Sequence, residues 1–203
     1  YYLMSGNENY VHPAMPPGVE DGIVRGMYKL KSCELTGATA KVNLFGSGAI
    51  LRLILAAQDL LAERYQIASN VWSVTSYTQL RRDAHACERW NMLHPAEPPR
   101  QSYVEQTLAG ESGVFVAASD YVRALPEQIS RWVPGELYAL GTDGMGRSET
   151  REALRRHFEV DAESIALATL YRLHKRGQFD ASFVAQAIKD LGVNPEKVDP
   201  YFA

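Results

Sequence analysis

Several features that would assign a function directly are missing from this chain of 203 residues. Its two cysteines, Cys33 and Cys87, lie far apart and form no CxxC pair, which favours two unpaired thiols in a reducing compartment over a disulfide framework. The longest apolar stretch, 49–61, is interrupted by Arg52 and Asp59 and is shorter than the roughly 20 residues of a membrane span. The net charge of -3 gives no electrostatic reason to expect nucleic acid or an anionic membrane as partner.

Motifs that carry catalysis or bind metals are absent as well. There is no GxSxG turn for a nucleophile, no HExxH, and no histidine–cysteine grouping with zinc spacing. We therefore interpret the histidines as structural or solvated, and we predict no catalytic residue and no metal site in this chain. The five histidines are His12, His85, His94, His157 and His174.

What the sequence does contain is a pattern of strands alternating with helices. This pattern predicts an α/β fold with a mainly parallel sheet covered on both faces, and ligands at the carboxyl ends of its strands. Ile50, Ile54, Ala57 and Leu61 share one face of a helix and are expected in the core. Strands are predicted at 27–31, 41–45, 70–76, 113–118 and 137–141, helices at 20–26, 49–61 and 120–132, and three closing helices capped by Ser148, Asp161 and Asp180.

The beginning of the chain resembles the junction between two folded units. Residues 1–4 read as the end of a strand that no signal peptide precedes, and 6–18 is rich in Pro, Gly and Asn. We expect the chain to be cut from a larger protein. The predicted division is a linker at 1–22, from a preceding catalytic domain, and one α/β domain at 23–203.

The turn Gly46-Ser47-Gly48 lies between a predicted strand and a predicted helix. Two glycines there would let backbone N–H groups approach an anion at the helix N-terminus, so these three residues are candidates for an anion site. A dinucleotide fingerprint would need a third small residue where Leu51 stands, and a Walker loop would need Lys followed by Ser or Thr. A tight structural turn is the favoured interpretation, and the anion site stays open.

A second glycine-rich stretch, 141–148, contains Asp143-Gly144, which is similar to the start of a motif that binds diphosphate and magnesium. That motif needs paired asparagines some 25 to 30 residues later to complete the oxygen shell of the ion, and 169–178 has none. A strand-to-helix turn is therefore favoured here.

The segment 86–95 mixes aromatic and polar side chains and is predicted to lie outside regular elements. Such a loop can form an interface or the wall of a ligand site, and it can equally be a packed connection anchored by Trp90. Arg89, Trp90 and His94 are the interface candidates.

Taken together, long motifs resemble the C-terminal domain of the homodimeric bacterial type of pyruvate dehydrogenase decarboxylating component, within the transketolase-like superfamily. The resemblance spans essentially the whole chain. The residues that carry it are Asn7–Tyr10, Pro13–Pro16, Gly26–Leu30, Leu44–Arg52, Trp72–Ser76, Cys87–Pro95, Gly141–Gly144, Gly146–Ser148, Arg151–Glu152 and His157–Ala162.

This resemblance implies a three-layer, Rossmann-like domain with a five-stranded, mostly parallel sheet whose first strand is antiparallel. It implies a cytoplasmic multienzyme complex of bacterial glycolytic metabolism, in which the whole enzyme decarboxylates pyruvate on thiamine diphosphate with magnesium. The acetyl group would then pass to the lipoyl group of dihydrolipoyl acetyltransferase. The cofactor motifs of the family lie in its first two domains, so no cofactor is expected in this chain.

The role implied for this segment is non-catalytic assembly and scaffolding. Its partners would be the missing N-terminal and middle domains, a second copy in a homodimer, and the acetyltransferase. The alternative is a module that docks an effector or partner through an anion site at Gly46–Gly48. A different enzyme of the superfamily, such as a transketolase or a sugar-phosphate synthase, is disfavoured by the motif at 87–95.

Overall fold

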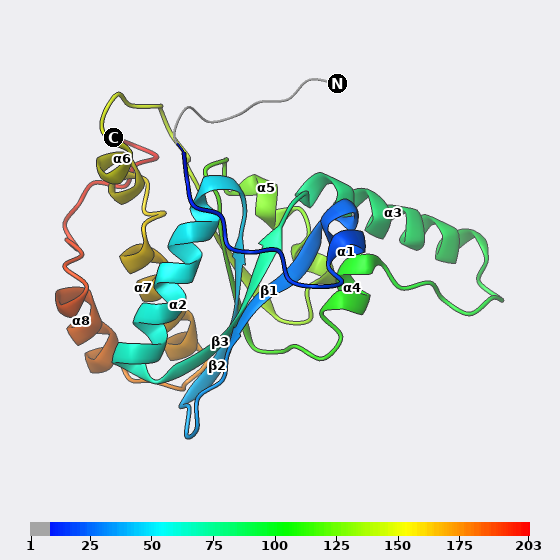
Figure 1. Cartoon of the computed structure of the whole chain (residues 1–203), viewed down its shortest axis with the longest axis horizontal. Helices are drawn as coiled ribbons and strands as arrows, with labels where there is room; N and C mark the ends of the chain where they lie inside the picture. Colours follow the sequence, from blue (N-terminus) through cyan, green and yellow to red (C-terminus); the bar gives the residue numbers. More distant parts are fainter. Residues whose placement is uncertain (1–8) are drawn as a thin grey trace.

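The computed structural model describes residues 9–203, so the predicted strand end at 1–4 and the first part of the predicted linker lie outside the described residues. From residue 9 to residue 19 the chain forms neither helix nor strand, and α1 (Glu20–Arg25) follows. Figure 1 shows this dark blue segment crossing from the side of α2 to α1.

Five strands form one mixed sheet in the order β1-β3-β2-β4-β5 (Figure 1). The edge strand β1 (Met27–Cys33) pairs antiparallel with β3 (Ile67–Val74), and β2 (Ala40–Gly46), β4 (Val114–Ala118) and β5 (Glu136–Leu140) extend the sheet in parallel. Every residue of β3 and β4 is buried, as expected of parallel strands covered on both faces. The predicted α/β sheet, including its antiparallel first strand, is confirmed.

One face of the sheet packs against α2 (Leu51–Tyr65) and α7 (Ala162–Lys175), and α8 (Ala181–Asp190) packs against α7. The predicted core stripe of α2 and the turn before it is confirmed, because its four side chains are almost completely buried; they are Ile50, Ile54, Ala57 and Leu61. Burial of such a stripe contributes about 1.5–3 kcal/mol for each large aliphatic side chain, which fixes α2 against β2 and β3.

The other face packs against α3 (Tyr77–Leu93), α4 (Tyr103–Thr107), α5 (Ala124–Glu127) and the short 3-10 helix η2 (Ser130–Trp132). Phe45 lies edge-on to both Trp72 and Phe115, with ring centroids 6.5 and 5.7 Å apart. Helices therefore cover both faces, and the domain has the three layers that the resemblance implied (Figure 1).

The single helix predicted at 120–132 is wrong. The structure has instead the four residues of α5 and the three of η2. Pro126 explains the difference, because proline lacks an N–H and its ring clashes with the carbonyl four residues earlier. A helix can hold Pro126 only in its first turn, and α5 accordingly begins at Ala124.

Helix caps at the end of the chain are confirmed in two cases out of three. The side chains of Asp161 and Asp180 accept hydrogen bonds from the backbone N–H groups of Ser164 and Phe183. The predicted cap Ser148 is wrong, because α6 (Arg151–His157) begins two residues later than predicted and Thr150 caps it.

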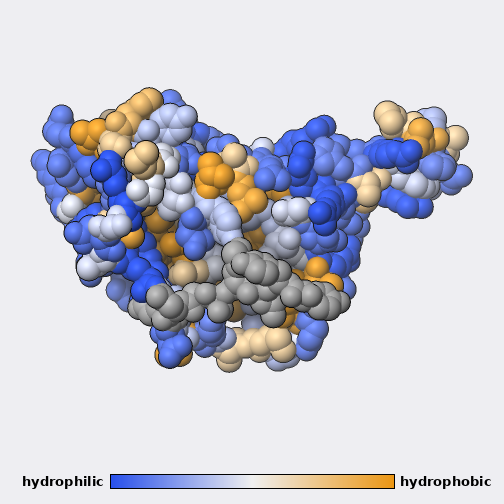
Figure 2. All heavy atoms as spheres, turned by 90° about the horizontal axis from the view of Figure 1, so that it is seen from above, coloured by the Kyte–Doolittle hydropathy of each residue, from blue (hydrophilic) through white to orange (hydrophobic). Residues whose placement is uncertain are grey.

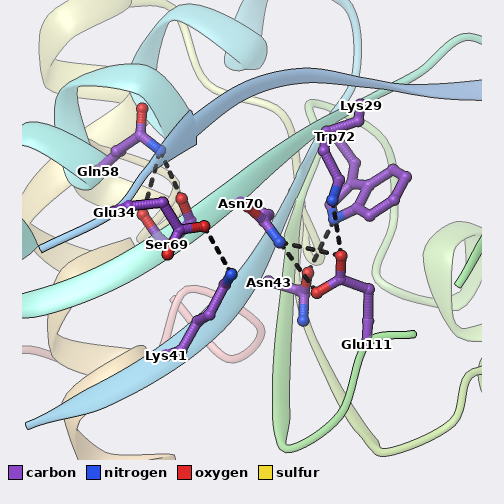
Figure 3. Close-up of polar contacts among 9 residues, drawn as sticks. All are labelled: Lys29, Glu34, Lys41, Asn43, Gln58, Ser69, Asn70, Trp72 and Glu111. Atoms are coloured by element: carbon purple, nitrogen blue, oxygen red, sulfur yellow. Dashed lines mark hydrogen bonds and ion pairs between the residues drawn. The ribbon is translucent and has the colours of Figure 1, made fainter. Parts of the chain in front are cut away.

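A partly buried polar network lies where β1, β3 and β2 meet the loop after α4 (Figure 3). Asn70 donates to both carboxylate oxygens of Glu111, Lys29 Nζ lies 2.7 Å from the same carboxylate, and Trp72 Nε1 donates to Asn43. Buried polar groups are stable only with such partners, so this network fixes the loop against the edge of the sheet.

Candidate functional site

The turn Gly46-Ser47-Gly48 connects β2 to the 3-10 helix η1 (Gly48–Ile50), which continues into α2. Gly48 has a φ of +54°, and a Cβ on Gly46 would lie 2.9 Å from the Cα of Leu51. These glycines are therefore required by the turn itself, as the structural interpretation predicts.

A cavity of about 610 Å³ opens above this turn, at the carboxyl ends of β2, β3 and β4. Ser47, Gly48, Ser76 and Asp120 line it, and none of its wall residues among positions 9–203 is a lysine or arginine. The exposed carboxylate of Asp120 lies close to Gly48: its Oδ1 would be 3.6 Å from a Cβ added at Gly48. Because this group is negatively charged, the charges around the turn do not favour an anion. The anion site at Gly46, Ser47 and Gly48 stays a prediction.

The stretch 141–148 is held by an ion pair. Asp143 accepts a hydrogen bond of 3.0 Å from the backbone N–H of Arg123 and pairs with the guanidinium of the same residue. The hydrogen bond to the Asp143 carboxylate raises the pKa of Arg123 above its ordinary value, and the negative charge of that carboxylate raises it further. Burial acts in the opposite direction but is outweighed. This carboxylate is therefore engaged within the chain, which agrees with the structural interpretation of the Asp143-Gly144 turn.

The segment 86–95 is not the loop that the sequence predicted. Residues 86–93 form the second half of α3, and only 94 and 95 lie outside the helix; the buried residues of α3, Tyr77, Leu80 and Ala84, all lie in its first half. The second half leaves the body of the domain and the chain returns along 94–102 (Figure 1). No core faces these turns, so the sequence carries no helical periodicity there. We call residues 89–101 the arm.

Aromatic and hydrogen-bond contacts hold the arm together. The ring of His94 stacks on Trp90 with centroids 4.5 Å apart, and the guanidinium carbon of Arg100 lies 3.8 Å from the Trp90 ring centre. Asn91 exchanges two hydrogen bonds of 2.8 and 2.9 Å with the backbone of Arg100. Two of the interface candidates, Trp90 and His94, are thus brought together, while Arg89 stands exposed beside them.

The tip of the arm is apolar and open to solvent. Met92 is 71% exposed and Leu93 is 51% exposed, although a projecting helix end in a protein that stands alone is usually polar. Figure 2 shows the tip as a knob set apart from the body, with apolar side chains among hydrophilic ones. Sequence reasoning missed these two residues because an apolar pair in a supposed loop gives no signal of exposure.

Two of the histidines, His85 and His174, make contacts typical of structural groups, while His12 is exposed. His85 lies edge-on to Trp132 at 5.0 Å and 3.4 Å from Glu88, and His174 bonds the carbonyl of Phe179. Within residues 9–203, no three side chains of His, Cys, Asp or Glu gather as a metal site would require. In the same range, no helix combines the length and apolarity needed to cross a membrane.

Residues 26–161 match the family described as the transketolase-like TK C-terminal domain. The chain belongs to this family. As a member of the transketolase-like C-terminal domain family, it is also similar over its whole length to larger bacterial proteins. It is 48% identical over 204 aligned residues to the C-terminal part of the pyruvate dehydrogenase E1 component of Escherichia coli (strain K12), and it covers 22% of that protein.

Further similar proteins are found. The pyruvate dehydrogenase E1 component of Pseudomonas aeruginosa is 49% identical over 201 residues, which are 98% of this chain and 23% of that protein. The transketolase-like domain thus spans about a fifth of the length of the curated relatives that it matches. A transketolase from Leishmania mexicana is 20% identical and covers 80% of this chain and 21% of that structure, with a TM-score of 0.48.

The family implies thiamine diphosphate for a whole enzyme, and the described residues of this transketolase-like domain do not fit that cofactor. Its diphosphate requires a magnesium ion with oxygen ligands, yet Asp143 is held by Arg123 and no carboxylate cluster lies nearby. No catalytic step is therefore assigned to any residue of this chain.

Proposed function

We propose that this chain is the C-terminal domain of a pyruvate dehydrogenase E1 component and serves its assembly rather than its chemistry. The whole enzyme would decarboxylate pyruvate with thiamine diphosphate and magnesium. It would pass the acetyl group to the lipoyl group of dihydrolipoyl acetyltransferase in the bacterial cytoplasm. The identity of 48% over the full chain supports the parent enzyme, and the two free cysteines are compatible with that compartment.

One observation carries the assembly role, namely the projecting arm. Arg89, Trp90 and His94, with the exposed Met92 and Leu93, present an aromatic and apolar surface that the body of the domain does not cover. Tryptophan, methionine and arginine are the residue types that protein interfaces enrich. We propose a second copy of the chain as the occupant of this surface, in line with the homodimer that the resemblance implies.

We also propose a division of the chain into two parts. Residues 1–22 would connect the preceding catalytic domain, and 23–203 would form the α/β domain. The family match at 26–161 lies inside the second unit. Helix α1, which begins at Glu20, already packs against β1 and so supports an assignment of its last residues to the domain.

An exchange experiment tests this function. In the E. coli relative, the matching C-terminal part would be replaced by residues 1–203. The exchanged enzyme is expected to decarboxylate pyruvate and to acetylate the lipoyl domain, whereas the chain alone with pyruvate, thiamine diphosphate and magnesium is expected to give no turnover. Turnover by the chain alone would contradict a non-catalytic role, and an exchanged enzyme active only on sugar phosphates would favour the transketolase alternative.

A further inference from the structure

A second cavity lies at the point where the sheet changes direction. In the sheet, β3 lies on one side of β2 and β4 lies on the other side of β2. The connection that leaves β2 and the connection that leaves β4 therefore run in opposite directions. In open α/β sheets this divergence opens a crevice at the carboxyl ends of the two strands. The cavity has a volume of about 290 Å³ and is lined by Tyr10, Ala49, Ile50, Asp120, Thr142, Arg151, Leu154, Arg155, Phe158 and Val160.

Its walls combine an apolar floor with two cations. Ile50, Phe158 and Val160 are buried and form part of the floor. Arg151 and Arg155 stand one turn apart on α6, so their guanidinium groups share a helix face. Pockets for small molecules are typically about 300–1,000 Å³, mostly apolar, with a few polar groups that orient the ligand. The volume of this cavity is just below that range, so it suits a compact ligand.

Tyr10 forms one wall and comes from the segment before α1. Arg155 Nη2 donates to the Tyr10 hydroxyl at 2.9 Å, and the guanidinium carbon of Arg52 lies 4.7 Å from the Tyr10 ring centre. Arg155 therefore faces both the cavity and the segment that would connect the preceding domain. An anion in the cavity would compete with the Tyr10 hydroxyl for the same guanidinium.

The carboxylate of Asp120 fixes how a ligand would lie. Asp120 is a wall of this cavity and also of the larger one above the Gly46–Gly48 turn. Because like charges repel, a negative group is favoured at the α6 side, next to the arginines, and disfavoured at the Asp120 side. Unlike the predicted site at Gly46–Gly48, this cavity offers side-chain cations.

We propose that this cavity, here called the switch-point cavity, binds a small organic anion with a compact apolar body, held at its carboxylate or phosphate by Arg155. Its occupation weakens the contact between Arg155 and Tyr10 and thereby loosens the segment before α1. This binding function goes beyond the proposed assembly role and does not depend on it.

The test uses the full chain with phenyl phosphate and benzoate as probes and benzyl alcohol as the uncharged match. Calorimetric titration is expected to show saturable binding of one or both anions and no binding of the alcohol. The ratio of the affinities for the two anions identifies the preferred head group. Arg155→Gln is expected to weaken binding by about tenfold or more, because a charge-assisted hydrogen bond is lost. Arg156→Gln, next along α6 and outside this cavity, is the matched control and should leave affinity unchanged.

A second variant separates binding from folding. Tyr10→Phe keeps the ring and removes the hydroxyl that occupies Arg155, so it should bind the anion about threefold more tightly with an unchanged circular dichroism spectrum. Absence of binding, equal binding of benzyl alcohol, an equal effect of Arg155→Gln and Arg156→Gln, or weaker binding by Tyr10→Phe would each overturn the proposal. All of these readouts are independent of the oligomeric state.

Discussion

The side-chain amide of Asn70 donates to both carboxylate oxygens of Glu111, at distances of 3.0 and 2.9 Å, across 41 positions of the sequence. Lys29 completes the network at 2.7 Å (Figure 3). Because the Glu111 side chain is only 13% exposed, removal of its charge leaves the buried amide of Asn70 and the half-exposed ammonium of Lys29 without an ionised acceptor.

Glu111→Gln is therefore expected to lower the free energy of unfolding by about 2 kcal/mol, as hydrogen bonds to charged groups contribute about 1.5–3 kcal/mol. Urea unfolding measures the change. Glu34→Gln is the matched control: its 2.7 Å ion pair with Lys41 is exposed, so a loss of about 0.5 kcal/mol or less is expected. Equal losses in the two variants would show that the Glu111 network stabilises the fold no more than an exposed ion pair does.

The same carboxylate predicts how stability depends on pH. Burial alone raises the pKa of Glu111, but hydrogen bonds from Lys29 and Asn70 outweigh it and hold the pKa below its ordinary value of 4.5. As the pH falls, Glu111 is therefore protonated at a higher pH in the unfolded chain than in the folded chain. The contribution of Glu111 is complete above pH 4.5 and is lost as the pH falls through its lower folded pKa. Urea midpoints between pH 6 and pH 3 should fall less steeply in Glu111→Gln than in the original chain.

Gly144 holds the C-terminal end of the chain against the domain. Its φ is +95°, and a Cβ there would lie 2.4 Å from the carbonyl oxygen of Pro200. Gly144→Ala is expected to displace residues 199–203, seen as faster amide exchange there, and to cost about 1–2 kcal/mol of stability from the strained backbone alone. Gly146→Ala, with no atom within 4 Å of its added Cβ, should do neither. Identical exchange in both variants would contradict this role.

Cys87 is expected to be an unreactive thiol. Burial raises its pKa above the ordinary 9.0, and the charges of Asp83 and Glu105 raise it further, so little thiolate forms at neutral pH. In a Cys33→Ser background, modification by an aromatic disulfide reagent should be slow at pH 8 and still accelerate above pH 9. A rate that levels off below pH 9 would contradict the raised pKa.

Sequence reasoning succeeded where a residue pattern reflects burial. The stripe from Ile50 to Leu61 and the caps Asp161 and Asp180 follow local rules that the core and the helix ends enforce. It failed at α3, where the half that leaves the body has no core to impose periodicity, and at 120–132, where Pro126 limits the helix to a single turn.

The switch-point cavity shows a different limit. The arginine pair at 151 and 155 is visible in the sequence, but its convergence with Tyr10, 145 positions away, depends on how the segment before α1 crosses the sheet edge. No local pattern encodes that crossing. The expected position of ligands at the carboxyl ends of strands was the one signal available.

The central claim, assembly through the arm, is tested most directly by the mass of the chain in solution. Sedimentation across a concentration series is expected to show reversible association to a dimer, which Met92→Glu abolishes by placing a charge in the apolar contact. Val198→Glu makes the same change at an exposed valine near the C-terminus and should leave the association intact. A chain that stays monomeric at every concentration, or a dimer that Met92→Glu does not weaken, would contradict the account.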